Sequence, residues 1–274
     1  MKHNTLTRLI VLILCLGMVF TLSACSKDEE PSEPVDADLS SSEPEEEEEE
    51  IIEDALERPL LMEKIDAGIK RNVDTVGWLY IPNTEIDDAV LQAADNNYYL
   101  RLTEDKVYDI YGCYFMDFES KQGSGSQMSK QNIIYGHSNL RDDPDGRDFS
   151  QLFRFLDIDF VRENPYIYYS TKGEEMVWQI FAVMKTKVND SVNGFYYLDA
   201  DPPSADFLKM IDEGKARSEY IVDVPVTAND KILTLSTCMA KDNYRVVVMA
   251  KLLPATKQLA PTVEVQANPN TKVS

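Results

Sequence analysis

The stretch KILTLSTCMAKDNYRVVVMAKLL, residues 231–253, holds two apolar runs rich in β-branched residues, Ile232–Thr237 and Tyr244–Leu253. Runs of this composition predict β-strands. The six residues between Cys238 and Arg245 are enough only for a tight connection. We therefore expect two neighbouring strands, with a cysteine at the end of the first and an arginine at the start of the second.

A cysteine in that position suggests nucleophilic chemistry. A thiol reacts as its thiolate, so a catalytic cysteine needs a base or a cation close by. The chain has two histidines, and His3 lies in an N-terminal segment that we expect to be removed. His137 follows an apolar run in NIIYGH, residues 132–137. Cys238, His137 and Arg245 could therefore converge at one rim of a sheet or barrel.

These residues resemble the signature of the sortases, which are cysteine transpeptidases of the Gram-positive cell surface. The matching blocks are TLSTC at 234–238, Arg245 followed by three valines, and IIYGH at 133–137. Three further blocks resemble the class B branch: VGWLYIPNTEID at 76–87, DNNYYL at 95–100 and GCYFMD at 112–117. A helical insertion before the cysteine strand resembles that branch as well. One short motif is weak, but several blocks in the family's order are specific. The resemblance covers roughly Pro59–Leu253.

The strand pattern predicts a mainly β domain. Seven or eight strands without regular strand and helix alternation indicate an antiparallel or mixed β-barrel with peripheral helices. The resemblance implies the closed eight-stranded sortase barrel, with an N-terminal helix and helical insertions. The expected elements include a helix over 56–71, a strand over 108–118, a hairpin over 166–186 and a helix over 206–217.

The resemblance also implies a mechanism. Cys238 would attack a sorting signal of NPxTx or LPxTG type in a surface protein, and a thioester would form. His137 would act as acid and base, and Arg245 would hold the substrate backbone or the oxyanion. The acceptor would be an amine of a peptidoglycan precursor or a pilin, and no cofactor is implied. A cysteine hydrolase without transfer and a non-catalytic surface-binding lipoprotein remain as alternatives.

Weaker indications concern the surroundings of these three residues. The hydroxyls of Ser236 and Thr237 could support the pocket, and Tyr135 and Asn132 could line it. Asp242 could orient a catalytic group or face solvent in a turn. The aspartates of 139–148 could form a calcium loop, but their spacing lacks the downstream glutamate and favours a solvated loop.

The N-terminus has the pattern of a secretory signal. Basic residues precede the apolar run Leu9–Phe20, which is short for a membrane span and ends near LSAC, residues 22–25. LSAC resembles the lipobox of bacterial lipoproteins. We expect residues 1–24 to be a signal peptide and Cys25 to carry lipid, which would place the protein on the extracellular face of the cytoplasmic membrane. An uncleaved N-terminal anchor is the alternative.

The flanking segments are polar. Ser26–Glu57 holds sixteen acidic residues against one lysine, so residues 25–58 predict an extended, disordered spacer before a catalytic domain at 59–253. The net charge of −21 argues against nucleic acid as a partner. Residues 254–274 predict a disordered tail, in which NPNTK at 268–272 resembles an NPxTx signal by coincidence or as a pseudosubstrate. Nothing in the sequence suggests more than a monomer.

Of the four cysteines, Cys15 lies within the expected signal peptide and Cys25 would carry lipid, so Cys113 and Cys238 remain as thiols. Cys113 lies among aromatic residues in the strand expected over 108–118, a setting typical of a buried, inert cysteine. A disulfide between Cys113 and Cys238 is the alternative, and it would consume the proposed nucleophile.

Overall fold

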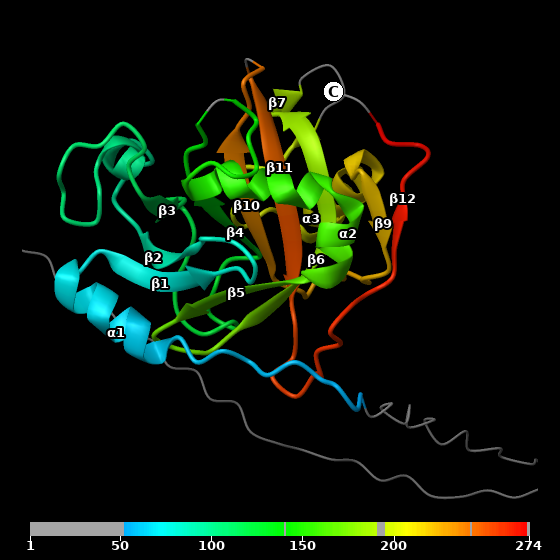
Figure 1. Ribbon diagram of the computed structural model, residues 1–274, viewed down its shortest axis with the longest axis horizontal. Helices are drawn as coiled ribbons and strands as arrows, with labels where there is room; N and C mark the ends of the chain where they lie inside the picture. Colours follow the sequence, from blue (N-terminus) through cyan, green and yellow to red (C-terminus); the bar gives the residue numbers. More distant parts are fainter. Residues whose placement is uncertain (1–51, 140, 191–194, 242, 273–274) are drawn as a thin grey trace, which may run out of the picture. The chain divides into compact units, whose positions relative to one another are not determined.

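Eight strands close into one barrel in the order β1-β2-β3-β4-β10-β11-β6-β5 (Figure 1). The predicted mainly β fold with a closed eight-stranded barrel is therefore confirmed. The barrel strands are β1 (Thr75–Tyr80), β2 (Asp87–Leu91), β3 (Tyr114–Met116), β4 (Gln131–Tyr135), β5 (Tyr166–Thr171), β6 (Val177–Lys187), β10 (Ile232–Cys238) and β11 (Tyr244–Leu252).

This computed structural model describes residues 52–272 except 140, 191–194 and 242. The expected signal peptide, Cys25, most of the acidic spacer and Asp242 lie outside the described residues. Among the residues it does describe, no helix combines the length and the apolar character needed to cross a membrane.

Helices and short strand pairs surround the barrel. Helix α1 packs against β1 through the buried residues Ile65 and Gly68. The two short sheets pair β9 with β12 and β7 with β8. The remaining elements are α1 (Met62–Arg71), η1 (Tyr98–Arg101), η2 (Asp148–Leu156), α2 (Ile158–Glu163), β7 (Asn189–Asp190), β8 (Phe195–Tyr196), α3 (Ser204–Arg217), β9 (Tyr220–Val222) and β12 (Val265–Ala267).

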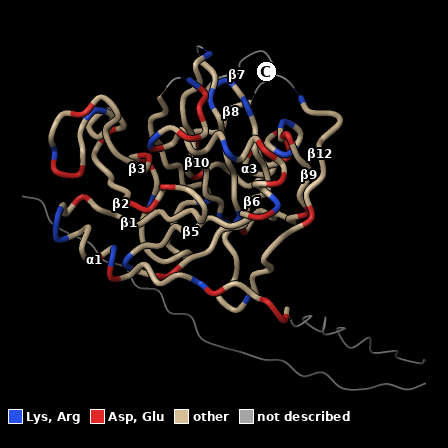
Figure 2. The backbone as a smooth tube through the Cα atoms, viewed as in Figure 1, with Lys and Arg blue, Asp and Glu red and all other residues tan. Residues whose placement is uncertain are grey.

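Burial of apolar side chains holds the barrel together. Along β1, buried and half-buried positions alternate, as expected for a strand with one face toward the core. Strand β10 is instead buried from Ile232 to Thr237 because its outer face is covered as well. Basic and acidic residues are interspersed along the described chain (Figure 2). Exposed ion pairs such as Arg71–Asp105, at 2.6 Å, add little to stability, because water screens the charges and ordering the two side chains costs entropy.

The register of β10 brings three segments to one edge of the barrel. Strand β10 runs parallel to β4, where Ser236 pairs with Tyr135, and antiparallel to β11, where Cys238 pairs with Arg245. The ends of β4 and β10 therefore meet the start of β11. Adjacent strands lie about 4.8 Å apart, so side chains at these ends are close neighbours.

The N-terminal helix is shorter than predicted. Apolar spacing predicts a helix over 56–71, whereas α1 begins at Met62. Leu56 instead donates its backbone N–H to the carbonyl of Leu259 at 2.7 Å. Glu175 Oε1 accepts the N–H groups of Leu61 and Met62, both at 2.8 Å, and so caps the helix start. These tertiary contacts therefore determine the residue at which α1 begins.

The strand predicted over 108–118 is also shorter, because only β3 (Tyr114–Met116) forms. Asp109 Oδ1 accepts the N–H of Tyr111, and Gly112 donates to the carbonyl of Asp109. Gly112 has φ +61°, a conformation that glycine adopts readily. A local turn therefore replaces the first half of the expected strand. Cys113 nevertheless is buried, as expected.

The C-terminal segment is ordered, contrary to the predicted disordered tail. Strand β12 pairs with β9, and the side chains of Leu259 and Val265 are buried. Leu259 also accepts the hydrogen bond from Leu56, so this segment fastens the start of the described chain. The prediction of disorder failed because few residues of this segment are apolar, yet two of them, Leu259 and Val265, are buried against the fold.

The NPNTK segment lies against α3 and β9. Asn268 Nδ2 donates to the carbonyl of Ser218 at 2.9 Å, and Lys272 donates its N–H to the carbonyl of Ala216. Neither Ser218 nor Ala216 lines the cavity described below. The pseudosubstrate hypothesis therefore receives no support from the structure.

Replacing the tail anchor tests its contribution. We expect Leu259→Ala to lower the free energy of unfolding by about 2–5 kcal/mol, because a fully buried leucine is truncated. Urea unfolding followed by tryptophan fluorescence measures this change. Lys257→Ala, at an exposed neighbouring position, serves as the control. Equal stability of both variants and the wild type would show that residues 254–272 contribute nothing to the fold.

Candidate active site

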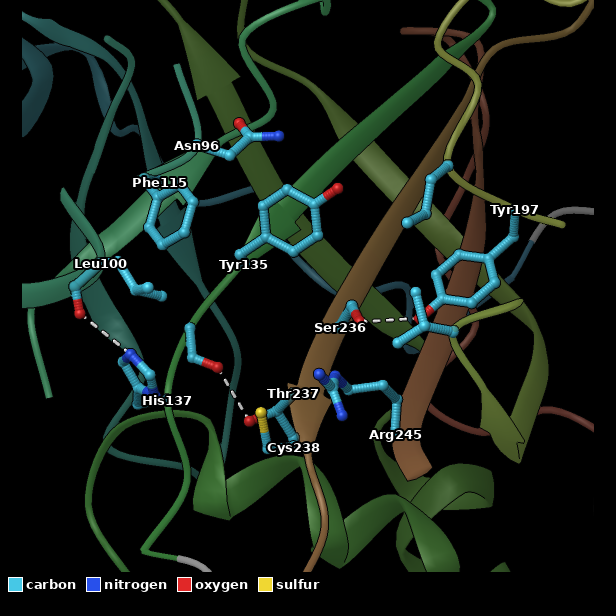
Figure 3. A pocket seen from close by; sticks show the side chains of 13 residues that line it. Asn96, Leu100, Phe115, Tyr135, His137, Tyr197, Ser236, Thr237, Cys238 and Arg245 are labelled. Carbon is cyan, nitrogen blue, oxygen red and sulfur yellow. Dashed lines mark hydrogen bonds between the residues drawn. The ribbon is translucent and has the colours of Figure 1, made fainter. Parts of the chain in front are cut away.

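Cys238, His137 and Arg245 line one cavity of about 260 Å³. Cys238 ends β10, His137 follows β4 after Gly136, and Arg245 stands near the start of β11. Figure 3 shows Cys238 between the imidazole and the guanidinium. All three side chains are partly exposed, so a ligand in the cavity could reach them. The structure thus brings together the three residues that the sequence analysis selected.

Two hydroxyl groups tie the histidine segment to the cysteine segment. Thr237 Oγ1 donates to the carbonyl of Gly136 at 2.8 Å, and Ser138 Oγ donates to the carbonyl of Cys238 at 2.6 Å. Both hydroxyl residues are buried. These crossed bonds flank His137 and Cys238 on each side, so we call Thr237 and Ser138 the hydroxyl clasp. The clasp fixes the loop after β4 relative to the end of β10.

The imidazole of His137 is held from the side of η1. Its Nε2 lies 2.9 Å from the carbonyl oxygen of Leu100 and 2.5 Å from Arg101 Nη1. Burial, and next the positive charge of Arg101, lower the pKa of His137, and Arg245 adds a smaller effect. The imidazole is therefore predominantly neutral near pH 7.

Arg245 presents a fixed cation to the cavity. Its Nη1 donates to the carbonyl of Tyr244 at 2.8 Å, which restrains the side chain. A guanidinium carries five N–H donors in one plane, so donors remain for a ligand. In Figure 3 the guanidinium points from β11 toward Cys238. This arrangement suits stabilisation of negative charge beside the sulfur.

The two cysteines of the described residues differ in reactivity. Both are free thiols, so the alternative of a disulfide between Cys113 and Cys238 is wrong. Burial raises the pKa of the Cys113 thiol, which keeps it protonated and unreactive. Cys238 is partly exposed beside His137 and Arg245. Only Cys238 therefore has the surroundings of a nucleophile.

Of the predicted pocket residues, Tyr135, Ser236 and Thr237 line the cavity, whereas Asn132 does not. Asn132 is fully buried, and its Nδ2 donates to the carbonyls of Ser129 and Ile232 at the opposite end of β4. The prediction for Asn132 was wrong because it rested on closeness to His137 in the sequence. Asn132 lies near the start of β4, and His137 follows the end of that strand.

The sequence analysis missed several lining residues, which come from the η1 region, β3 and the segments around β7 and β8. They are Asn96, Leu100, Phe115, Val188, Tyr197 and Leu198. Most are apolar, and their distribution over four segments left no single motif to recognise. Asn96 and Leu100 do lie within the DNNYYL block, but that block was used only for its resemblance.

A buried carboxylate orders the polar wall of the cavity. Asp117 Oδ2 accepts hydrogen bonds from the hydroxyl of Tyr135 at 2.8 Å and from Asn96 Nδ2 at 2.7 Å. The hydroxyl of Tyr197 lies 3.1 Å from Ser236 Oγ on another wall. These side chains are therefore held in place before any ligand binds.

The aspartates after β4 have partners within the protein. Asp142 Oδ1 accepts the N–H of Ala240, Asp145 pairs with Arg154, and Asp148 pairs with Arg147. Across the described ranges, no group of three or more His, Cys, Asp or Glu side chains is arranged to hold a metal ion. The hydrogen bond between Ala240 and Asp142 also restrains the loop between β10 and β11.

Comparison with known proteins decides the family. The model of the sortase domain matches residues 79–253, which is more than half of the chain. The chain belongs to the sortase family. It is 36% identical over 188 residues to sortase B of Listeria monocytogenes and 31% identical over 188 residues to sortase B of Staphylococcus aureus. Each alignment covers 67% of this chain and 72% of the relative.

Solved structures place this sortase in class B. A crystal structure of sortase B complexed with triglycine superposes with a TM-score of 0.62 at 29% identity, over 72% of this chain and 88% of that structure. Sortase B of Clostridium perfringens superposes with a TM-score of 0.59 at 26% identity, over 69% and 99%. The protein is therefore a class B sortase, a cysteine transpeptidase. The family resemblance predicted from its sequence is confirmed.

The hydroxyl clasp can be tested at Ser138. We expect Ser138→Ala to lower the free energy of unfolding by about 0.5–1.5 kcal/mol, because the carbonyl of Cys238 loses its hydrogen bond from a buried hydroxyl. We also expect a loss of about tenfold in kcat/KM, because small displacements of reacting groups are costly. Urea unfolding and peptide-cleavage kinetics measure the two effects. The exposed Ser126→Ala is the control, and an unchanged kcat/KM in Ser138→Ala would contradict the role of the clasp.

Proposed function

We propose that Cys238 cleaves a sorting signal of NPxTx or LPxTG type and transfers the surface protein to an amine. The cavity that Cys238 shares with His137 and Arg245 is the observation that carries this proposal. Two sortase B structures support the kinds of ligand, one described as a substrate complex and one as a complex with triglycine. The acceptor is an amine of a peptidoglycan precursor or of a pilin.

The first half of the reaction forms a thioester. The Cys238 thiolate attacks the carbonyl carbon of the signal's threonine, and the carbon–nitrogen bond after it breaks. His137, in its protonated form, gives a proton to the departing amine. Arg245 donates to the oxyanion of the tetrahedral intermediate, because its guanidinium is fixed beside the sulfur. The surface protein is then bound to Cys238 through sulfur.

The second half of the reaction regenerates the enzyme. The acceptor amine attacks the thioester carbonyl and gives a proton to His137, while the Cys238 sulfur leaves as thiolate. The product is an amide between the surface protein and the acceptor. The apolar lining of the cavity favours this transfer, because an extended peptide packed against Leu100, Phe115 and Tyr197 leaves little room for water.

Mass spectrometry with peptides tests this function. The full-length protein is incubated with NPxTx and LPxTG peptides, with and without an amine acceptor. We expect a thioester on Cys238 and, with the amine, a ligated peptide. Cys238→Ala should abolish both, whereas Cys113→Ala, at a buried inert thiol, should retain them. Arg245→Lys should lower kcat by about 10²–10³-fold, because the planar set of donors is lost.

The outcomes separate the proposed function from its rivals. Cleavage without ligation in the presence of amines would identify a cysteine hydrolase. No acyl adduct on Cys238 with either peptide class would contradict the proposed substrate class. An adduct that survives in Cys238→Ala would contradict the assignment of the nucleophile.

The proposed location is the extracellular face of the cytoplasmic membrane, with lipid on Cys25. The LSAC sequence at 22–25 supports this part of the proposal. We expect Cys25→Ala to abolish incorporation of labelled palmitate in cells, because acylation needs this thiol. Cys15→Ala is the matched control. Undiminished labelling in Cys25→Ala would contradict lipidation there, as would no labelling of the wild type.

A further inference from the structure

Asp117 is a buried residue that follows β3 and lies behind the cavity of Cys238. It is 4% exposed and does not line the cavity itself. Its backbone is fixed, because its N–H donates to the carbonyl of Ile133 at 2.8 Å and its carbonyl accepts Gln92 Nε2 at 2.7 Å. The carboxylate is therefore a fixed acceptor that acts on the cavity only through its neighbours.

Three donors share this carboxylate. Oδ1 accepts the backbone N–H of Glu119 at 2.9 Å. Oδ2 accepts Asn96 Nδ2 at 2.7 Å and the hydroxyl of Tyr135 at 2.8 Å. Because a carboxylate has no hydrogen to give, each neighbour must be the donor. Asn96 and Tyr135 both line the cavity, and Figure 3 shows their side chains apart from Cys238.

The side-chain amide of Asn96 is held at both of its ends. Its Oδ1 accepts the backbone N–H of Phe118 at 3.0 Å, while its Nδ2 donates to Asp117. Exchanging the oxygen and the nitrogen would break both hydrogen bonds, because a backbone N–H only donates and a carboxylate only accepts. The nitrogen carries two hydrogens, and Asp117 accepts one. Among the described residues no other acceptor binds Nδ2, so its second hydrogen is left for a ligand.

Tyr135 depends less on the carboxylate. Burial, and next the negative charge of Asp117, raise the pKa of Tyr135, which keeps the hydroxyl protonated. A hydroxyl both donates and accepts, and its hydrogen rotates to suit its partners. The amide nitrogen of Asn96 has no such freedom, because it only donates. Asn96 is therefore the neighbour whose position requires an acceptor at Asp117.

We propose that Asp117 is a positioning residue that directs an N–H donor of Asn96 at a carbonyl oxygen of the bound peptide. The proposal rests on the proposed function, because it takes the ligand of the cavity to be a peptide. Asp117 does not contact the reacting atoms. It therefore contributes to binding of the peptide and leaves the chemistry at Cys238 unchanged.

Asp117→Asn separates this role from the shape of the side chain. The substitution keeps the size and replaces one oxygen by an NH₂ group. The N–H of Glu119 still needs an acceptor, so the remaining oxygen faces Glu119 and the NH₂ group faces Asn96 and Tyr135. Tyr135 can turn its hydroxyl and accept, whereas Asn96 Nδ2 meets a second donor. The amide of Asn96 therefore loses its fixed position.

Peptide binding to the full-length Cys238→Ala protein, which cannot form a thioester, tests the proposal. Titration calorimetry gives the Kd of NPxTx and LPxTG peptides. We expect Asp117→Asn and Asn96→Ala each to raise the Kd about three- to tenfold, as for the loss of one hydrogen bond. The double variant should bind no more weakly than Asn96→Ala alone, because Asp117 acts through Asn96. In the active enzyme, Asp117→Asn should raise KM and leave kcat within about twofold.

Asp74→Asn is the matched control. Asp74 also accepts a tyrosine hydroxyl, from Tyr99, but Tyr99 does not line the cavity. The same change of donors thus occurs away from the ligand. We expect the Kd of this variant to equal that of the Cys238→Ala parent.

Two binding results would overturn the proposal. An unchanged Kd in Asn96→Ala would show that Asn96 gives no hydrogen bond to the peptide, and this test stands even if Asp117→Asn does not fold. Additive losses in the double variant would show that Asp117 acts by another route.

Failure of the proposed function has a different signature. A peptide that binds as expected but forms no adduct on Cys238 in the active enzyme would contradict the reaction alone. If neither peptide binds, the substrate class is wrong, and ¹⁵N NMR of the Asn96 side-chain amide decides the positioning without any peptide. We expect that signal to shift in Asp117→Asn and to stay in Asp74→Asn. An unchanged signal in Asp117→Asn would contradict the role of Asp117.

Discussion

The register of β10 between its two neighbours is the constraint on which the site depends. Parallel pairing with β4 and antiparallel pairing with β11 bring two strand ends and one strand start to a single edge. A shift of one residue would turn every side chain of β10 to its opposite face and move Cys238 away from Arg245. The continuous burial of Ile232–Thr237 opposes such a shift, because each position already contacts the protein interior.

Local hydrogen bonds refine what the register provides. The hydroxyl clasp joins the backbone on either side of His137 to that of Cys238, so the two side chains share one rigid frame. The carbonyl of Leu100 and the guanidinium of Arg101 contact the imidazole of His137 from the side of η1. The frame holds the imidazole and the thiol at the wall of one cavity.

The sequence predicted the parts of this structure that depend on local pattern. The strands around Cys238 and His137, the hairpin of β5 and β6, and α3 follow from apolar runs and spacing. Features set by distant contacts were missed. Glu175 fixes the start of α1, Leu259 orders the tail, and the turn at Asp109–Gly112 shortens the strand before Cys113. None of these contacts leaves a periodic signal in the chain.

The same distinction applies to the cavity. Cys238, His137 and Arg245 were found because nucleophilic chemistry restricts the residue types and because His137 is the only histidine beyond position 3. Asn132 was misplaced because it lies at the start of β4, whereas His137 follows the end of that strand. Arg101 was missed because its contact with His137 joins two segments that are distant in the chain. Its neighbour Leu100 lies within a block that matches the family, but that match does not show which side chains the block contacts.

The central claim is that His137 activates Cys238 and leaves Cys113 inert, and alkylation measures this most directly. The full-length protein is treated briefly with iodoacetamide at neutral pH, and each cysteine is mapped by mass spectrometry. The account predicts label on Cys238, little on the buried Cys113, and a slower reaction of Cys238 in His137→Gln. Equal labelling of the two thiols, or an unchanged rate in His137→Gln, would contradict it.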